Sequence, residues 1–105
     1  MAFANVAASQ TDSSIVSAVA GKSITVLGFG LVAGATATTV TFNSKGAGAG
    51  TAISALYALP ISGVCVFPVS APSSGYWFKT NVGEALTVTT GAGATTGIEI
   101  VIQIV

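Results

Sequence analysis

Charged residues are scarce in this chain. They make up 6% of its 105 residues, against 51% that are hydrophobic, whereas a typical soluble domain has about 25% charged residues. The three lysines are scattered and arginine is absent, so no basic face can form for nucleic acid or for an anionic membrane surface. We therefore expect neither partner. Because so few charges remain to keep the surface hydrated, we expect neighbouring protein subunits to cover much of it.

Histidine is absent as well. Its absence removes the usual general base and the commonest metal ligand, and with them serine–histidine and cysteine–histidine catalysis and most zinc sites. A paired-carboxylate site would have to combine Glu84 with Glu99, or either of them with Asp12, and surface carboxylates explain these residues better. The sequence thus predicts a protein that is not an enzyme, with no catalytic residue, metal, cofactor or small-molecule substrate.

Cysteine is limited to Cys65. This residue cannot form an internal disulfide, and its apolar neighbours predict a buried, unreactive thiol. Long apolar runs that could form a helix are missing too, because glycine and proline interrupt the uncharged segments 23–44 and 46–78. We therefore expect no transmembrane helix. The first five residues carry no positive side chain, so we also expect no secretory signal.

The chain does contain the alternation typical of β-strands. Val40 and Phe42 alternate with threonines, as do the apolar residues over 84–90, and this pattern is typical of half-buried strands. The longest alternating run covers 98–105, with isoleucines on one face and Glu99 on the other. At an open edge such a strand would promote aggregation, so we expect it to be paired centrally or capped by another subunit.

About eight short strands are predicted, with turn signals about every 8 to 12 residues. This spacing predicts an all-β chain, and we expect a single-domain antiparallel β-sandwich, jelly-roll-like, over residues 14–105. Residues 1–13 are small and polar, and we expect them to form an extended N-terminal arm or an ordered lead-in to the domain. The segment 51–59 has apolar residues at helical spacing, but we favour a strand. The segment 61–67 is predicted to be a buried strand.

Three consecutive aromatic residues, Tyr76, Trp77 and Phe78, precede a turn. In an extended strand neighbouring side chains point to opposite faces, so Tyr76 and Phe78 should share one face and Trp77 should take the other. The rings either belong to the core, or form a protein contact on one side of this strand. Both interpretations remain open at this point.

Taken in order, five short segments resemble small virion proteins of tailed bacteriophages, and are similar to the capsid decoration, or cement, proteins. These segments are Ser9-Gln10-Thr11-Asp12, Ala18-Val19-Ala20-Gly21-Lys22, Val40-Thr41-Phe42, Gly75-Tyr76-Trp77-Phe78 and Gly83-Glu84-Ala85-Leu86. The resemblance covers most of the chain, and the order of the set carries it. The chain departs from the pattern at Lys79, where an acidic residue is expected, and after Lys22, where an arginine is expected.

The resemblance implies a jelly-roll-like fold, a homotrimer and a position on the outer capsid surface of the virion. There the protein would clamp neighbouring copies of the major capsid protein, after synthesis in the host cytoplasm. Candidate residues for contacts between subunits are Tyr76, Trp77, Ile98, Ile100 and Ile102. Candidate residues for contacts with the capsid are Asp12, Lys45 and Lys79, and we expect the arm 1–13 and the loop 44–50 to contribute as well.

Two other functions remain open. A tail or fibre module that binds host surface glycan would stack Trp77 or Tyr76 on a sugar ring, although no cluster of Asn, Asp or Arg surrounds them. A self-assembling coat or sheath subunit would polymerise without a partner. Against this last possibility, 105 residues is small for a chain that builds a shell alone.

Overall fold

Ten β-strands make up the regular structure of this chain in the computed structural model, which describes residues 2–69, 75–93 and 95–105. These ranges contain no α-helix, and so none that could cross a membrane. In chain order the strands are β1 (Ala2–Val6), β2 (Ser13–Val16), β3 (Ile24–Ala33), β4 (Thr38–Lys45), β5 (Thr51–Ala52), β6 (Tyr57–Leu59), β7 (Val64–Phe67), β8 (Phe78–Lys79), β9 (Ala85–Thr90) and β10 (Thr96–Ile104). The all-β prediction is therefore confirmed.

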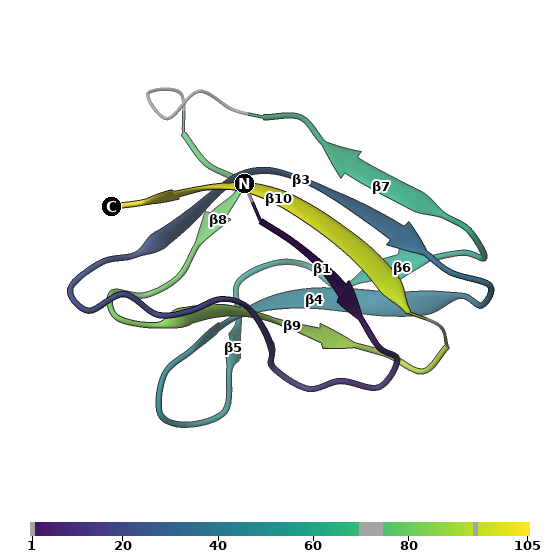
Figure 1. The fold of residues 1–105 in the computed structure, drawn as a ribbon, viewed down its shortest axis with the longest axis horizontal. Helices are drawn as coiled ribbons and strands as arrows, with labels where there is room; N and C mark the ends of the chain where they lie inside the picture. Colours follow the sequence, from purple (N-terminus) through teal and green to yellow (C-terminus); the bar gives the residue numbers. More distant parts are fainter. Residues whose placement is uncertain (1, 70–74, 94) are drawn as a thin grey trace.

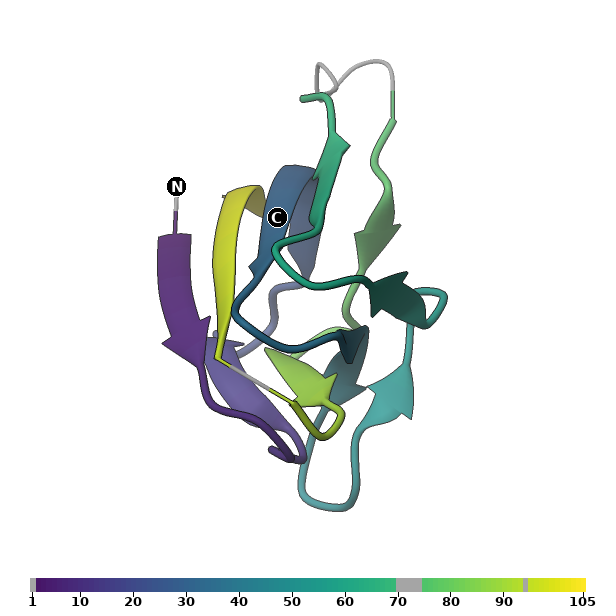
Figure 2. The same ribbon diagram turned by 90° about the vertical axis from the view of Figure 1, so that its right-hand side faces the viewer.

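The strands form two antiparallel sheets (Figure 1). The first sheet has the order β1-β10-β3-β7, and β8 also pairs with β3. The second sheet has the order β2-β9-β4-β5, and β6 also pairs with β4. In Figure 2, β1, β10, β3 and β7 lie side by side, with the strands of the second sheet beneath them. Each sheet can thus bury one face against the other.

The core lies between the sheets and consists of the apolar half of each alternating strand. Val40 and Phe42 of β4 are fully buried, as are Leu86 and Val88 of β9, which is what their alternation with threonine predicted. From the first sheet the same cluster includes Ile24, Val26, Phe29, Leu31, Ile98 and Ile100. Burying one such side chain contributes about 1.5–3 kcal/mol. The hydrophobic pattern therefore decides which face of each strand points inward.

β10 is a central strand, which is one of the two placements that the sequence left open for 98–105. It pairs with β1 along one side and with β3 along the other. Ile98 and Ile100 point into the core, while Glu99 between them is exposed. After Val101 the register between β10 and β3 shifts, and Ile104 near the C-terminus is exposed. The inward alternation of isoleucines therefore holds only for the first half of the strand.

The N-terminal residues belong to the first sheet, which corrects the expectation of a separate arm over 1–13. β1 pairs with β10 from Ala2 opposite Ile100 to Val6 opposite Thr96. Val6 is buried, and the small side chains of the alanines in β1 pack against the core. Of residues 1–13, Met1 alone lies outside the described residues. A short run of small residues is compatible with an arm, but small side chains also fit a strand that lies beside β10.

β7 lies at the edge of the first sheet, which corrects the prediction of a buried strand over 61–67. It pairs with β3 along one side, and its side chains alternate between two surroundings. Cys65 and Phe67 pack against the core, whereas Val64 and Val66 are exposed. In the segment 51–59 the preference for strand is confirmed, because β5 and β6 both pair with β4.

Candidate functional site

The outer face of the first sheet carries large apolar side chains that no other described part of the chain covers. Phe3 of β1 is 80% exposed and Val66 of β7 is 68% exposed, and Val32 and Val64 are exposed beside them. Val32 and Val64 are register partners on β3 and β7. We call these four residues, Phe3, Val32, Val64 and Val66, the apolar face. Exposed apolar residues gathered on one surface mark interaction sites in soluble proteins.

Glycines between these side chains open a groove across the apolar face. Gly30 of β3 and Gly97 of β10 lie on its floor, between Phe3 on one side and the valines of β7 on the other. The groove has a volume of about 290 Å³. A Cβ atom at Gly30 would come no closer than 3.9 Å to Val66 Cγ2, so the floor has free space above it. The groove can therefore receive side chains from another molecule.

Glu99 supplies the charge in this groove. Its side chain is exposed and lies among apolar lining residues and the amide of Asn5. Within the described part of the chain, it accepts no side-chain hydrogen bond and forms no ion pair. The other two carboxylates are held: Asp12 by several donors, and Glu84 by Ser44 Oγ at 2.6 Å and Asn81 Nδ2 at 3.3 Å. Glu99 is thus available to a partner.

The outer face of the second sheet has a different character. Thr39 and Thr41 of β4 and Thr89 of β9 are half-buried there, and Thr89 Oγ1 accepts a hydrogen bond of 2.8 Å from Asn43 Nδ2. Threonine hydroxyls on an outer face are compatible with contact with water. The two outer faces therefore differ, and the apolar one belongs to the first sheet.

Asp12 holds three separate elements together on the second sheet. Its carboxylate accepts hydrogen bonds from Asn43 Nδ2 at 3.1 Å, Thr87 Oγ1 at 3.0 Å and the Gly50 backbone N–H at 3.0 Å. The hydrogen bond from the Gly50 N–H is the main cause that lowers the pKa of Asp12 below its ordinary value of 3.8. The Asp12 carboxylate is therefore engaged within the chain, and a contact between Asp12 and the capsid stays a prediction.

Lys45 and Lys79, the other two capsid-contact candidates, lie on different sheets. Lys45 Nζ donates a hydrogen bond of 2.6 Å to the Gly48 carbonyl oxygen, in the loop that Asp12 also contacts. Lys79 is exposed on β8, with its Nζ 5.3 Å from the centroid of the Tyr76 ring. The structure thus brings Asp12 and Lys45 to one loop and leaves Lys79 apart from them.

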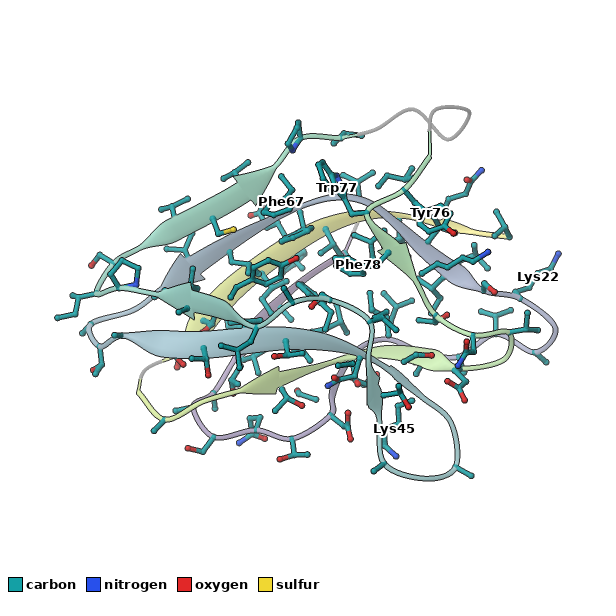
Figure 3. The ribbon with its side chains drawn as sticks, turned by 180° about the vertical axis from the view of Figure 1, so that it is seen from behind. Lys22, Lys45, Phe67, Tyr76, Trp77 and Phe78 are labelled. Atoms are coloured by element: carbon teal, nitrogen blue, oxygen red, sulfur yellow. The ribbon has the colours of Figure 1, made fainter. Side chains whose placement is uncertain are left out.

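Tyr76 and Trp77 precede β8 and do not follow its alternation. Phe78 is buried and points between the sheets, whereas Tyr76 is 50% exposed and Trp77 is 42% exposed. Trp77 packs edge-on against Phe67 with centroids 4.8 Å apart, and its Nε1 donates to the Pro68 carbonyl oxygen at 2.9 Å. Figure 3 shows Trp77 beside Phe67, and Phe78 beneath them. The expectation that Tyr76 and Phe78 share a face is wrong, because the strand begins only at Phe78.

The isoleucine candidates for subunit contacts need correction. Ile98 and Ile100 are each 1% exposed within the core, so no partner can reach them. Ile102 is half-buried and packs against the core. The inward face of a central strand is the place where a periodic isoleucine run is expected to lie. Of the five residues, Tyr76 and Trp77 remain accessible.

The apolar face was missed at the sequence level. Val64 and Val66 lie in a continuous apolar run that predicts burial on both sides, and Phe3 lies in a segment assigned to an arm. The scarcity of charged residues predicted that neighbouring subunits cover part of the surface, but it did not show which part. The described residues contain no group of three His, Cys, Asp or Glu side chains that could hold a metal ion.

The geometry therefore offers a surface for binding another macromolecule, built from apolar side chains, a glycine floor and one carboxylate. Comparisons with protein-family models, with curated proteins and with solved structures found no match for this chain.

Proposed function

We propose that this chain is a non-enzymatic structural protein of a tailed-bacteriophage virion. It forms a homotrimer on the outer capsid surface and, as a capsid decoration protein, stabilises the lattice of the major capsid protein. The observation that carries the proposal is the apolar face, on which Phe3 is 80% exposed. In a chain with 6% charged residues, such a face marks a surface that another protein covers. The resemblance of the sequence to decoration proteins indicates the kind of assembly.

We also infer that the fold is a jelly-roll β-sandwich. Strands β1 to β4 alternate between the sheets, as do β8 to β10, and the order β1-β10-β3-β7 of the first sheet places the first and last strands side by side. Two pairs of short strands each share one neighbour: β5 and β6 lie along β4, and β7 and β8 lie along β3. Counting each pair as one interrupted strand leaves eight, the number in a jelly roll. This fold is suited to a small subunit that presents one sheet to its neighbours.

The free energy that the apolar face can contribute to binding favours many simultaneous contacts over a single one. Complete burial of a valine or phenylalanine side chain contributes about 1.5–3 kcal/mol, so the four partly exposed residues of the apolar face offer roughly 5 kcal/mol. Association itself costs about 4–15 kcal/mol. A single contact of this size is therefore weak. Several contacts within a trimer and along a capsid lattice raise the effective concentration and make binding stable.

Stabilisation of the capsid would then follow from linkage. A protein that binds the assembled lattice and not the free capsid protein shifts the equilibrium toward the assembled form by mass action. This mechanism requires no catalytic group, no metal and no cofactor. It is consistent with a chain whose titratable side chains hold the fold together, as Asp12 and Glu84 do.

Glycan binding by a tail or fibre module is the second candidate, and the exposure of Tyr76 and Trp77 is the observation in its favour. Both rings already have partners. Trp77 packs against Phe67, and the ammonium group of Lys79 lies over the ring of Tyr76. A sugar would have to compete with these contacts, which makes a protein partner the better account.

The proposal is tested with capsids of the encoding phage that lack this protein. The purified chain and its Val66→Asp variant are each mixed with such capsids, and the bound fraction is measured by co-sedimentation. We expect the chain to bind at saturating, stoichiometric levels and to raise the temperature at which the capsids disrupt, and the variant to do neither. Failure of the unmodified chain to bind, together with glycan-array binding that Trp77→Ala abolishes, would replace the proposal with the glycan-binding alternative.

A further inference from the structure

We propose that the groove of the apolar face receives the Tyr76–Lys79 corner of a second copy of this chain, and that Glu99 of one copy pairs with Lys79 of the next. The inference rests on the proposed function, because it names the contact that would build the trimer. Both patches belong to every subunit, so a contact between them joins copies head to tail. Such contacts close into rings when the rotation between copies permits it.

The two charges cannot pair within one subunit. In the first sheet Glu99 lies opposite Gly30 of β3, and Lys79 lies opposite Thr25 of the same strand. Five residues of strand separate Gly30 from Thr25, which corresponds to about 17 Å. At this separation two exposed charges are largely screened by salt. Each of them is therefore available to an opposite charge from another molecule.

The groove requires a cation from whatever fills it. An apolar partner that covered Glu99 without a positive charge would leave a carboxylate desolvated and unpaired, which is costly. A partner with an ammonium or guanidinium group avoids this cost and gains a charge-assisted hydrogen bond. The groove therefore selects an apolar or aromatic surface that carries one cation.

The Tyr76–Lys79 corner has this composition. The Lys79 ammonium lies 5.3 Å from the centroid of the half-exposed Tyr76 ring, within the range of cation–π attraction. Lys45, by contrast, is engaged with the Gly48 carbonyl oxygen. Lys22 lies in a turn at one end of the molecule in Figure 3, and within the described residues no cation–π contact joins it to a ring. Among the three lysines, Lys79 is the one presented together with an exposed ring in the described structure.

The placement of the two patches allows both to be used at once. β7 and β8 both pair with the side of β3 away from β10, but β7 pairs with residues 29–32 and β8 with residues 25 and 26. The groove reaches from β1 to β7 over the first of these stretches, and the corner lies at the second. Figure 2 shows β1 and β8 on opposite sides of the first sheet. A subunit can therefore offer its corner to one neighbour while its groove accepts the corner of another.

A charge-swap experiment tests the contact. The variants are Glu99→Lys, Lys79→Glu and the double variant with both changes, and Lys22→Glu is the control because it makes the same charge change at another exposed lysine. The molar mass of each is measured by light scattering over a dilution series. We expect each single swap to weaken self-association by at least about tenfold, and the double swap and Lys22→Glu to restore or retain the assembly of the unmodified chain.

The outcomes separate this contact from the proposed function. Circular dichroism first checks that the variants are folded, as expected for substitutions of exposed side chains. If both single swaps assemble like the unmodified chain, or the double swap fails to recover assembly, the contact is wrong, whether or not the chain binds capsids. If the charge swap restores assembly of a dimer instead of a trimer, the contact holds and the trimer of the proposed function is contradicted.

Discussion

The ring of Phe29, on β3, meets the ring of Phe42, on β4, edge-on across the two sheets, with centroids 5.3 Å apart. Phe29 also stacks on Phe67 of β7, with centroids 4.5 Å apart. Edge-on and offset-stacked ring pairs each add about 0.5–1.5 kcal/mol beyond their burial. These rings connect the edge strand of the apolar face to the core of the protein.

Replacing Phe42 with alanine should lower the free energy of unfolding by about 3–5 kcal/mol, because it removes a fully buried ring and leaves a cavity. Phe42→Leu should cost less, since it keeps most of the volume. Urea denaturation monitored by Trp77 fluorescence measures both. Equal losses for the two variants would show that the cavity is not the dominant effect.

Replacing Asp12 with asparagine should reduce stability near neutral pH by about 1–3 kcal/mol, because hydrogen-bond donors of three residues lose a charged acceptor. The pKa of Asp12 is lowered in the folded state, so its contribution is present above its ordinary value of 3.8. The contribution is lost as the pH falls through the lower, folded-state pKa. Denaturation curves on both sides of pH 3.8 measure this difference.

Comparing the acid denaturation of the unmodified chain with that of Asp12→Asn separates the effect of Asp12 from that of the other carboxylates. Both proteins retain Glu84 and Glu99, but only the unmodified chain carries the Asp12 carboxylate. We expect the unmodified chain to lose more stability than Asp12→Asn on acidification. Parallel losses in the two proteins would contradict the role assigned to this carboxylate.

Gly28 and Gly30 of β3 should respond differently to alanine. A Cβ atom at Gly28 would lie 2.8 Å from the Cα atom of Val69, so the crossing chain must shift. We expect Gly28→Ala to destabilise the protein by about 1–3 kcal/mol. At Gly30 the nearest atom would be 3.9 Å away, and we expect a change within about 0.5 kcal/mol. Thermal unfolding of dilute samples compares the pair, and equal effects would show that Val69 does not pack closely on Gly28.

Phe3→Ser separates association from folding. Because Phe3 is mostly exposed, its loss should change the stability of the isolated subunit by no more than about 0.5 kcal/mol. The same substitution removes the largest side chain of the apolar face and should weaken self-association and capsid binding. A sedimentation assay and a denaturation curve on the same preparation measure the two effects, and loss of stability without loss of association would assign Phe3 to the fold.

The fold was predictable from the sequence wherever one face of a strand is polar. Threonines on either side of Val40 and Phe42 revealed a strand with one buried face, and the buried side chains are the ones predicted. The run over 98–105 predicted a strand in the same way, but its central position was one of two alternatives until the pairing with β1 and β3 was known. Where both faces of a strand are apolar, the sequence does not show whether the strand is central or at an edge. Val64 and Val66 fit a buried strand, and they also fit an edge strand that a partner covers, so only the pairing in the structure decides between the two.

The candidate site was less predictable, because its parts come from distant segments. Asp12 meets Asn43, Gly50 and Thr87 only after folding, and no spacing in the sequence connects them. Tyr76 and Trp77 were named as candidates for subunit contacts, but the direction in which each ring points depends on where β8 begins. The groove needs β1, β3, β7 and β10 together, so its residues could be named only from the structure.

The most direct test of the proposed function is the molar mass of the purified chain by light scattering, before and after mixing with assembled capsids that lack it. The proposal predicts a stable trimer that moves into the capsid fraction in a fixed ratio to the major capsid protein. A monomer that stays in solution at saturating capsid concentration would contradict it.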